Sequence, residues 1–286
     1  MSLTKDTPFP TDPNDPKPLI GLFVINSANL YSSVCDAEHV SDLLFSRLHA
    51  IKVVILFDAM SALNKVSEYM CKHASMSVLL QQGKIVMQHV ATKNALMSTI
   101  SSTCKDTASL GPCNMMMLLS SHGYSCGHEN FIHFNGARII DAEFRVCMMS
   151  SLPESTNCLA LIDACSSGSF MNLRYQCHDP KQWIKEVENP VLDQYSSKRN
   201  LVCIGAVSDN QYDQDDISDL GYDGGLSSSL IDYYMSFIDH DNDGTLAGGD
   251  KLKSIGGFFK YFHARIAAVH NIPQLSFNCE QFVSSS

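Results

Sequence analysis

Short apolar runs alternate along this chain with longer stretches in which apolar residues recur at helical spacing. A run that is apolar at every position, rather than at alternate positions, is typical of a strand buried on both faces of a parallel sheet. Strands of this kind are predicted at residues 19–25, 52–57, 115–119, 158–162 and 201–207.

Helices are predicted between and after these runs. Residues 35–49 carry a stripe of apolar side chains at helical spacing, after a candidate N-cap at Ser33. Further helices are predicted at 92–100, 141–149 and 225–238. The alternation of strand and helix predicts an α/β fold with a mostly parallel sheet that helices cover on both faces.

The remaining stretches suggest how the chain is divided. Residues 1–18 contain five prolines and no apolar core of a signal peptide, so a disordered leader is expected there. Residues 172–200 are polar and lack sustained periodicity, which indicates a surface linker. This linker separates a larger front part, residues 19–171, from a smaller back part, residues 201–286.

Composition indicates which binding partners and which cellular compartment to expect. The chain has 286 residues, 45% of them hydrophobic, which is ample for a packed core. Its formal net charge of −10, without any block of lysine or arginine, argues against nucleic acid and anionic membranes as partners and favours basic ligands. No apolar run approaches the roughly 20 residues that span a bilayer. The eleven cysteines are odd in number and none forms a CxxC pair, so a reducing, cytoplasmic setting is expected.

Two polar motifs directly follow two of the predicted strands. Ser120-Ser121-His122-Gly123 follows the run at 115–119, and Asp163-Ala164-Cys165-Ser166-Ser167-Gly168 follows the run at 158–162. The 43 residues between the histidine and the cysteine leave room for a strand, a crossover helix and the next strand. Because parallel strands end at the same edge of a sheet, the two side chains can meet there. The pattern predicts the Cys–His pair of a cysteine hydrolase.

Each part of such a catalyst has a candidate residue. Cys165 is the predicted nucleophile, and His122 is the predicted acid and base. The backbone N–H groups of Gly123 and Cys165 are the predicted oxyanion donors. The small residues after Cys165 favour a sharp turn into a helix, whose positive end would lower the pKa of the thiol.

Asp163 bears on the choice of substrate. Residues two apart on a strand share a face, so its carboxylate is expected to face the same cleft as the thiol. An unpaired carboxylate there would raise the pKa of the thiol, so a cation is expected beside it, such as a substrate lysine or arginine. The alternative is that the Asp163 carboxylate caps the next helix.

These residues resemble a known family. The His-Gly step at 122–123 and the Asp-x-Cys-x-Ser-Gly step at 163–168 are similar to the signature of metacaspases, the caspase-like cysteine peptidases of clan CD. Similarity extends over most of the chain, from about Leu19 to Phe282. It is carried by further segments at 19–37, 205–211, 224–230 and 272–276.

The resemblance implies both a fold and an activity. The fold would be one caspase-like α/β domain, with a mostly parallel six-stranded sheet flanked by helices and with large-subunit-like and small-subunit-like parts. The activity would be that of a thiol protease acting on proteins or peptides after Arg or Lys. Asp36, Asp163 and Asp209 would form the pocket for the basic side chain. The resemblance also makes Lys181, Lys185, Lys198 and Arg199 candidates for autocatalytic cleavage, against the alternative that they only keep the surface soluble.

A separate acidic segment follows the spacing of an EF-hand calcium loop. Its candidate ligands are Asp239, Asp241, Asp243, Thr245 and Asp250. Asp250 stands where a longer glutamate is usual, and the alternative is an acidic loop that caps a helix.

A second type of calcium site, which many metacaspases have, is only partly present. Asp141 fits it, but Ala142 and Asn172 stand where acids are common. Calcium stimulation is therefore a hypothesis, and the chemistry itself requires no cofactor.

The sequence is compatible with two other functional hypotheses. A caspase specific for Asp is disfavoured because Ser166 replaces the arginine that follows the nucleophile in caspases. A catalytically inactive caspase-like scaffold, or a calcium-binding module, would keep the fold and lose the chemistry, and the presence of both His122 and Cys165 argues against it. A monomer is expected.

Overall fold

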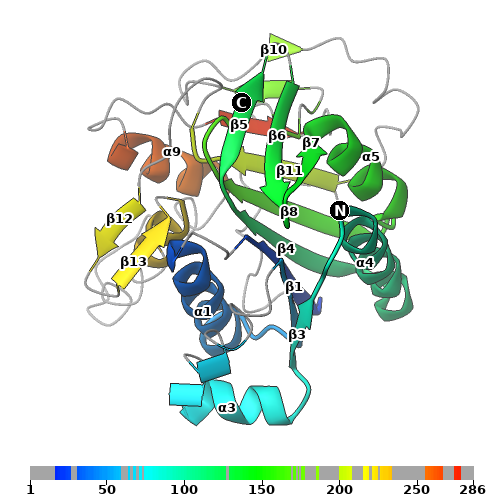
Figure 1. Cartoon of the computed structure of the whole chain (residues 1–286), viewed down its shortest axis with the longest axis vertical. Helices are drawn as coiled ribbons and strands as arrows, with labels where there is room; N and C mark the ends of the chain where they lie inside the picture. The colour runs from blue at the N-terminus through cyan, green and yellow to red at the C-terminus, as the bar shows by residue number, and fades with distance from the viewer. Residues whose placement is uncertain are drawn as a thin grey trace.

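A central sheet crosses the whole molecule in the computed structural model (Figure 1). The structure describes residues 17–26, 31–58, 64, 67–68, 71–72, 74–126, 129–168, 170–171, 173, 175–177, 185–186, 200–207, 215–218, 221–224, 226–233, 255–266 and 274–277. Within these residues the sheet has nine strands in the order β10-β9-β14-β11-β8-β4-β1-β2-β3. In chain order they are β1 (Leu19–Ile25), β2 (Lys52–Phe57), β3 (Ile85–His89), β4 (Cys113–Ser120), β8 (Thr156–Asp163), β9 (Tyr175–Cys177), β10 (Lys185–Glu186), β11 (Asn200–Gly205) and β14 (Gln274–Phe277).

The predicted α/β class is confirmed, but the predicted number of six strands is wrong for the whole sheet. The six strands from β11 to β3 are parallel to their neighbours. Three more strands extend one edge: β14 is antiparallel to β11, β9 to β14, and β10 to β9. The extra strands are too short for their apolar pattern to distinguish them from loops.

The five predicted strands are confirmed, with small changes at their ends. β1 and β2 have the predicted bounds, and β4 and β8 are slightly longer than their apolar runs. β11 ends at Gly205 rather than at residue 207, and the N–H of Ala206 still donates to the carbonyl of Ile162 on β8. β1 and β4 are buried along their whole length, which explains why both faces of these strands are apolar.

Helices cover both faces of the sheet and enclose two hydrophobic cores. The helices are α1 (Tyr31–Ser46), α3 (Ala74–Gln81), α4 (Lys93–Asp106), α5 (Asp141–Ser151), α9 (Ile255–Ile266) and helical residues 226–233, with a 3-10 turn at Thr107–Leu110. Side chains of α1, residues 226–233 and α9 join one core, and side chains of α4 and α5 join the other. Figure 1 shows these two groups on opposite sides of the sheet. The helix predicted at 225–238 is present at 226–233, and residues 225 and 234–238 lie outside the described part.

Two small sheets accompany the central one. β5 (Gly123–Cys126), β6 (Glu129–Phe134) and β7 (Ala137–Ile140) form an antiparallel sheet, whose inner face packs into the core of α4 and α5. β12 (Asp215–Ser218) pairs with β13 (Gly221–Gly224). β5 starts three residues after β4 ends, so this sheet is attached directly to the His122 motif.

Part of the stretch predicted as a surface linker belongs to the sheet. Tyr175, Gln176 and Cys177 of β9 are all buried, and they pair with β14 from the other end of the chain. This pairing partner is about a hundred residues away in sequence, so local polarity gave no sign of it. In the described part of the chain, no helix is both long enough and apolar enough to cross a membrane.

Candidate functional site

The site is built at the edge where β4 and β8 end. The two strands are parallel neighbours, and Ser120, the last residue of β4, pairs with Asp163, the last residue of β8. His122 and Cys165 each lie two residues beyond this pair. The structure thus places the two predicted catalytic residues at the same edge of the sheet, and both are partly exposed.

The two segments touch through their backbones. A Cβ atom on Gly123 would lie 1.8 Å from the carbonyl oxygen of Cys165 and 2.9 Å from its carbonyl carbon. No side chain fits in that space, so glycine is required by the close approach of one backbone to the other. The N–H of Ser121 also donates to the carbonyl of Asp163, at 3.2 Å. The segment that carries His122 is therefore fixed against the segment that carries Cys165.

A turn follows Cys165, where a helix was predicted. Ser166 has φ of 51°, in the left-handed region that non-glycine residues seldom occupy. The N–H of Phe170 then donates to the carbonyl of Ser167, at 3.1 Å, which closes a tight turn. In the residues that are described here, Cys165 lies in a turn and not at the start of a helix. The prediction that a helix dipole lowers the pKa of the thiol is therefore wrong for these residues.

Two buried carboxylates flank Ser120. Asp36 lies on α1 and is fully buried, and its Oδ2 accepts a hydrogen bond of 2.5 Å from the Ser120 hydroxyl. The same hydroxyl lies 2.8 Å from the Oγ of Ser33, also on α1. Paired positions of parallel strands point to the same face, so Ser120 and Asp163 both face α1. Two buried carboxyl groups thus lie close to the ends of β4 and β8.

Asp163 is also bound to a helix from the back part of the chain. Its Oδ2 accepts hydrogen bonds from the N–H of Ser227, at 2.8 Å, and from the Ser227 hydroxyl, at 2.9 Å. Its Oδ1 accepts a longer bond of 3.4 Å from the N–H of Leu226. A carboxylate at a helix N-terminus satisfies N–H groups that have no partner within the helix. The capping alternative therefore describes this carboxylate, and the helix that it caps begins 63 residues further along the chain.

Sequence reasoning missed the contacts of three serines at this edge, and the N-cap predicted at Ser33 is wrong because α1 already begins at Tyr31. The Ser120 hydroxyl binds both Ser33 and Asp36, and Ser227 binds Asp163. Ser120 lies inside the quoted motif, but serine is so common that only its place beside a paired aspartate in the sheet gives it meaning.

The predicted ligands of the EF-hand-like calcium loop cannot be placed in the structure. Asp239, Asp241, Asp243, Thr245 and Asp250 lie outside the described residues, as does the predicted pocket residue Asp209. Among the residues that are described, three or more His, Cys, Asp or Glu side chains nowhere gather closely enough to hold a metal ion.

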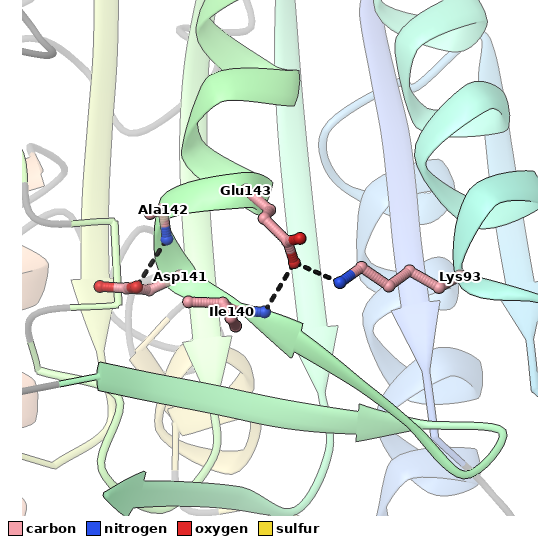
Figure 2. A network of polar contacts seen from close by, with 5 residues as sticks. All are labelled: Lys93, Ile140, Asp141, Ala142 and Glu143. Atoms are coloured by element: carbon pink, nitrogen blue, oxygen red, sulfur yellow. Dashed lines mark hydrogen bonds and ion pairs between the residues drawn. The ribbon is translucent and has the colours of Figure 1, made fainter. Parts of the chain in front are cut away.

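Asp141 begins α5, where the second type of calcium site was considered (Figure 2). Its Oδ1 accepts from the N–H of Ala142 at 2.6 Å. Glu143 points the other way, accepting from the N–H of Ile140 and pairing with Lys93, and this pairing is the main reason its pKa is lowered. These contacts hold the start of the helix together.

A buried arginine lies one turn further along α5. Arg145 donates to the carbonyl of Met171 at 3.3 Å. Burial lowers its pKa, and the negative charge of Asp141 opposes that shift. The positive charge of Arg145 thus already interacts with the carboxylate of Asp141.

The cysteines differ sharply in how deeply their thiols are buried. Burial raises the pKa of Cys104 and of Cys203 to about 12, and it also raises that of Cys158. A raised pKa leaves almost no thiolate at pH 8, so these thiols should resist alkylation. In contrast, Cys165 is partly exposed, and Cys71 and Cys126 are exposed.

We expect iodoacetamide at pH 8 to modify Cys165, Cys71 and Cys126 in the folded protein, and Cys104, Cys158 and Cys203 only after denaturation. Mass spectrometry of the digested protein measures the modified fraction of each peptide. Rapid labelling of Cys203 in the folded chain would contradict the burial of β11.

Comparisons with known proteins leave the family open. No protein-family model matches the chain, and no curated protein matches it. Among solved structures, the crystal structure of the Drosophila initiator caspase Dronc aligns with 99% of this chain and 91% of its own, with a TM-score of 0.43 and 8% sequence identity. A superposition this loose carries no argument about fold or activity. The conclusions on this site therefore rest on its own geometry: a histidine, a cysteine and two buried aspartates at one edge of a parallel sheet.

Proposed function

We propose that the chain is a cysteine endopeptidase of metacaspase type, with a caspase-like arrangement, that cleaves proteins or peptides after Arg or Lys. The observation that carries the proposal is the register of β4 and β8 together with the contact between Gly123 and Cys165. It supports a histidine and a cysteine on two segments whose backbones touch at a position where only glycine fits.

The proposed chemistry assigns one step to each group. The Cys165 thiolate attacks the scissile carbonyl carbon, and the N–H groups of Gly123 and Cys165 donate to the oxyanion. His122 gives a proton to the leaving amine as the C–N bond breaks, which leaves a thioester on Cys165. His122 then takes a proton from water, the hydroxide attacks the thioester, and the C–S bond breaks to release the acid product and restore the Cys165 thiolate beside protonated His122.

A preference for basic side chains is supported by charge. Asp36 and Asp163 are both buried and lie on either side of Ser120, close to the Cys165 segment. A substrate guanidinium or ammonium group would neutralise them, and a carboxylate side chain would be repelled. The net charge of −10 acts in the same direction. Asp209 is proposed as a third member of this pocket.

Regulation and setting are part of the same proposal. Calcium stimulation through the loop at 239–250 and autocatalytic cleavage in 172–200 are proposed, as are a monomeric state and a cytoplasmic location. The Asp141 region is a weaker candidate for calcium, because the carboxylate of Asp141 already interacts electrostatically with the guanidinium of Arg145.

The test is hydrolysis of fluorogenic peptides that end in Arg, Lys or Asp before the reporter group. We expect turnover with Arg and Lys, little with Asp, and none in Cys165→Ala, which serves as the blank. Each assay is run in chelator and in millimolar calcium, and equal rates would remove the calcium part of the proposal. Failure of all three peptides, at protein concentrations where an acyl-enzyme would be seen by mass spectrometry, would favour the inactive scaffold.

A further inference from the structure

Ser167 joins the segment that carries Cys165 to the segment that leaves β11. It lies two residues after the nucleophile, and its side chain is buried. Its hydroxyl donates to the carbonyl of Val207 at 3.3 Å and accepts from the N–H of Val207 at 3.2 Å. A single hydroxyl thus binds both backbone groups of one residue on a neighbouring segment.

A second contact joins the same two segments at a different atom. A Cβ atom on Gly205 would lie 2.5 Å from the carbonyl oxygen of Ser167 and 2.8 Å from its carbonyl carbon. The backbone of β11 therefore touches the backbone of Ser167, as Gly123 touches Cys165 from the other side. The turn after Cys165 is held between the ends of β4 and β11.

This turn needs such support. Ser166, between Cys165 and Ser167, has φ of 51°, a conformation that persists in a non-glycine residue only where the surroundings impose it. The contacts with Val207 and Gly205 are made by Ser167, the residue that directly follows Ser166. They are well placed to keep Ser166 in this conformation, and hence to keep the Cys165 thiol where it lies.

We infer that Ser167 is a positioning residue, which rests on the proposed function: its hydroxyl holds the nucleophile turn against Val207, so that the Cys165 thiol keeps a fixed place relative to His122. Ser167 acts through the turn and does not touch the reacting atoms.

The test uses two variants that disturb this contact in different ways. Ser167→Ala removes the hydroxyl, and Gly205→Ala keeps the hydroxyl but pushes on the Ser167 carbonyl. We expect each to lower kcat at least about tenfold with KM changed less than about twofold, because the thiol is displaced while the pocket remains. Ser167→Thr, which keeps a hydroxyl, should recover kcat to within about threefold of the wild type. Ser151→Ala is the matched control, since it removes a hydroxyl bond of 2.7 Å to Ser101 between α4 and α5.

A readout independent of peptide turnover separates this inference from the proposed function. The alkylation rate of Cys165 at pH 7 is measured relative to that of exposed Cys71 in the same sample, and thermal unfolding is followed in parallel. A ratio at least about threefold lower in Ser167→Ala, but unchanged in Ser151→Ala, supports the inference even if the wild type cleaves no peptide. An unchanged ratio, or an equal loss in Ser151→Ala, would overturn it. Should Ser167→Ala fail to fold, Gly205→Ala decides by the same two readouts.

Discussion

Gly123→Ala is expected to reduce kcat/KM for peptides ending in Arg by at least about 10²-fold. The new methyl carbon would lie 1.8 Å from the carbonyl oxygen of Cys165 and 3.2 Å from the Cβ of Ala164. Both the Cys165 oxygen and its carbon belong to the backbone, so no side chain can rotate away to make room. One of the two segments must move by more than about an ångström, and misplacement on that scale costs about a hundredfold in rate.

Steady-state kinetics with the fluorogenic peptides, beside thermal unfolding, measures this effect. Gly136→Ala is a suitable control in the same small sheet. Gly136 has φ of 76°, so alanine strains the backbone there, but nothing lies within 4 Å of the added Cβ. We expect Gly136→Ala to lose stability and to keep its activity. If Gly123→Ala keeps more than half of the wild-type kcat/KM, the described contact with Cys165 is wrong.

Asp163→Ala is expected to lower the free energy of unfolding by about 2–4 kcal/mol. The substitution leaves the N–H groups of Leu226 and Ser227 without their acceptor at a buried helix start. A buried donor without a partner costs about 1–3 kcal/mol, and loss of a helix cap costs about 0.5–2 kcal/mol. Urea unfolding followed by far-UV circular dichroism measures the loss.

Asp163→Asn separates the structural part from the charge. Asparagine keeps an acceptor oxygen for the helix, so we expect less than about half of the stability loss seen with alanine. If the charge also binds a basic side chain, kcat/KM for Arg peptides falls at least about tenfold in the asparagine variant. If kcat/KM in Asp163→Asn equals that of the wild type, the Asp163 carboxylate acts only as a helix cap. The proposed pocket for the basic side chain would then consist of Asp36 and Asp209.

The parallel core of the fold could be predicted from sequence because burial on both faces leaves an unbroken apolar run. β1, β2, β4, β8 and β11 all carry this signal. β9 and β14 do not, since each has only three or four residues, and their pairing joins segments about a hundred residues apart. The small sheet after His122 was missed because one of its faces is exposed and its strands are short.

The candidate site, too, has a part that could be predicted from sequence and a part that could not. The placement of His122 and Cys165 at one edge of the sheet could be predicted from two motifs that follow two apolar runs, because neighbouring parallel strands share an edge. The turn at Ser166 and the bonds from Ser227 to Asp163 could not be predicted. The first depends on backbone contacts from β4 and β11, and the second on a helix whose position relative to β8 only the folded chain defines.

The order of the strands also determines what a cut before β11 would do. β8 and β9 precede residues 187–199, whereas β11 and β14 follow them, and in the sheet the order is β9-β14-β11-β8. The two later strands are therefore interleaved between the two earlier ones. Cleavage at Lys198 or Arg199 would leave two fragments joined along two separate ladders of hydrogen bonds, β8 with β11 and β9 with β14. Such a nick would free the chain ends on either side of it without releasing either fragment from the sheet.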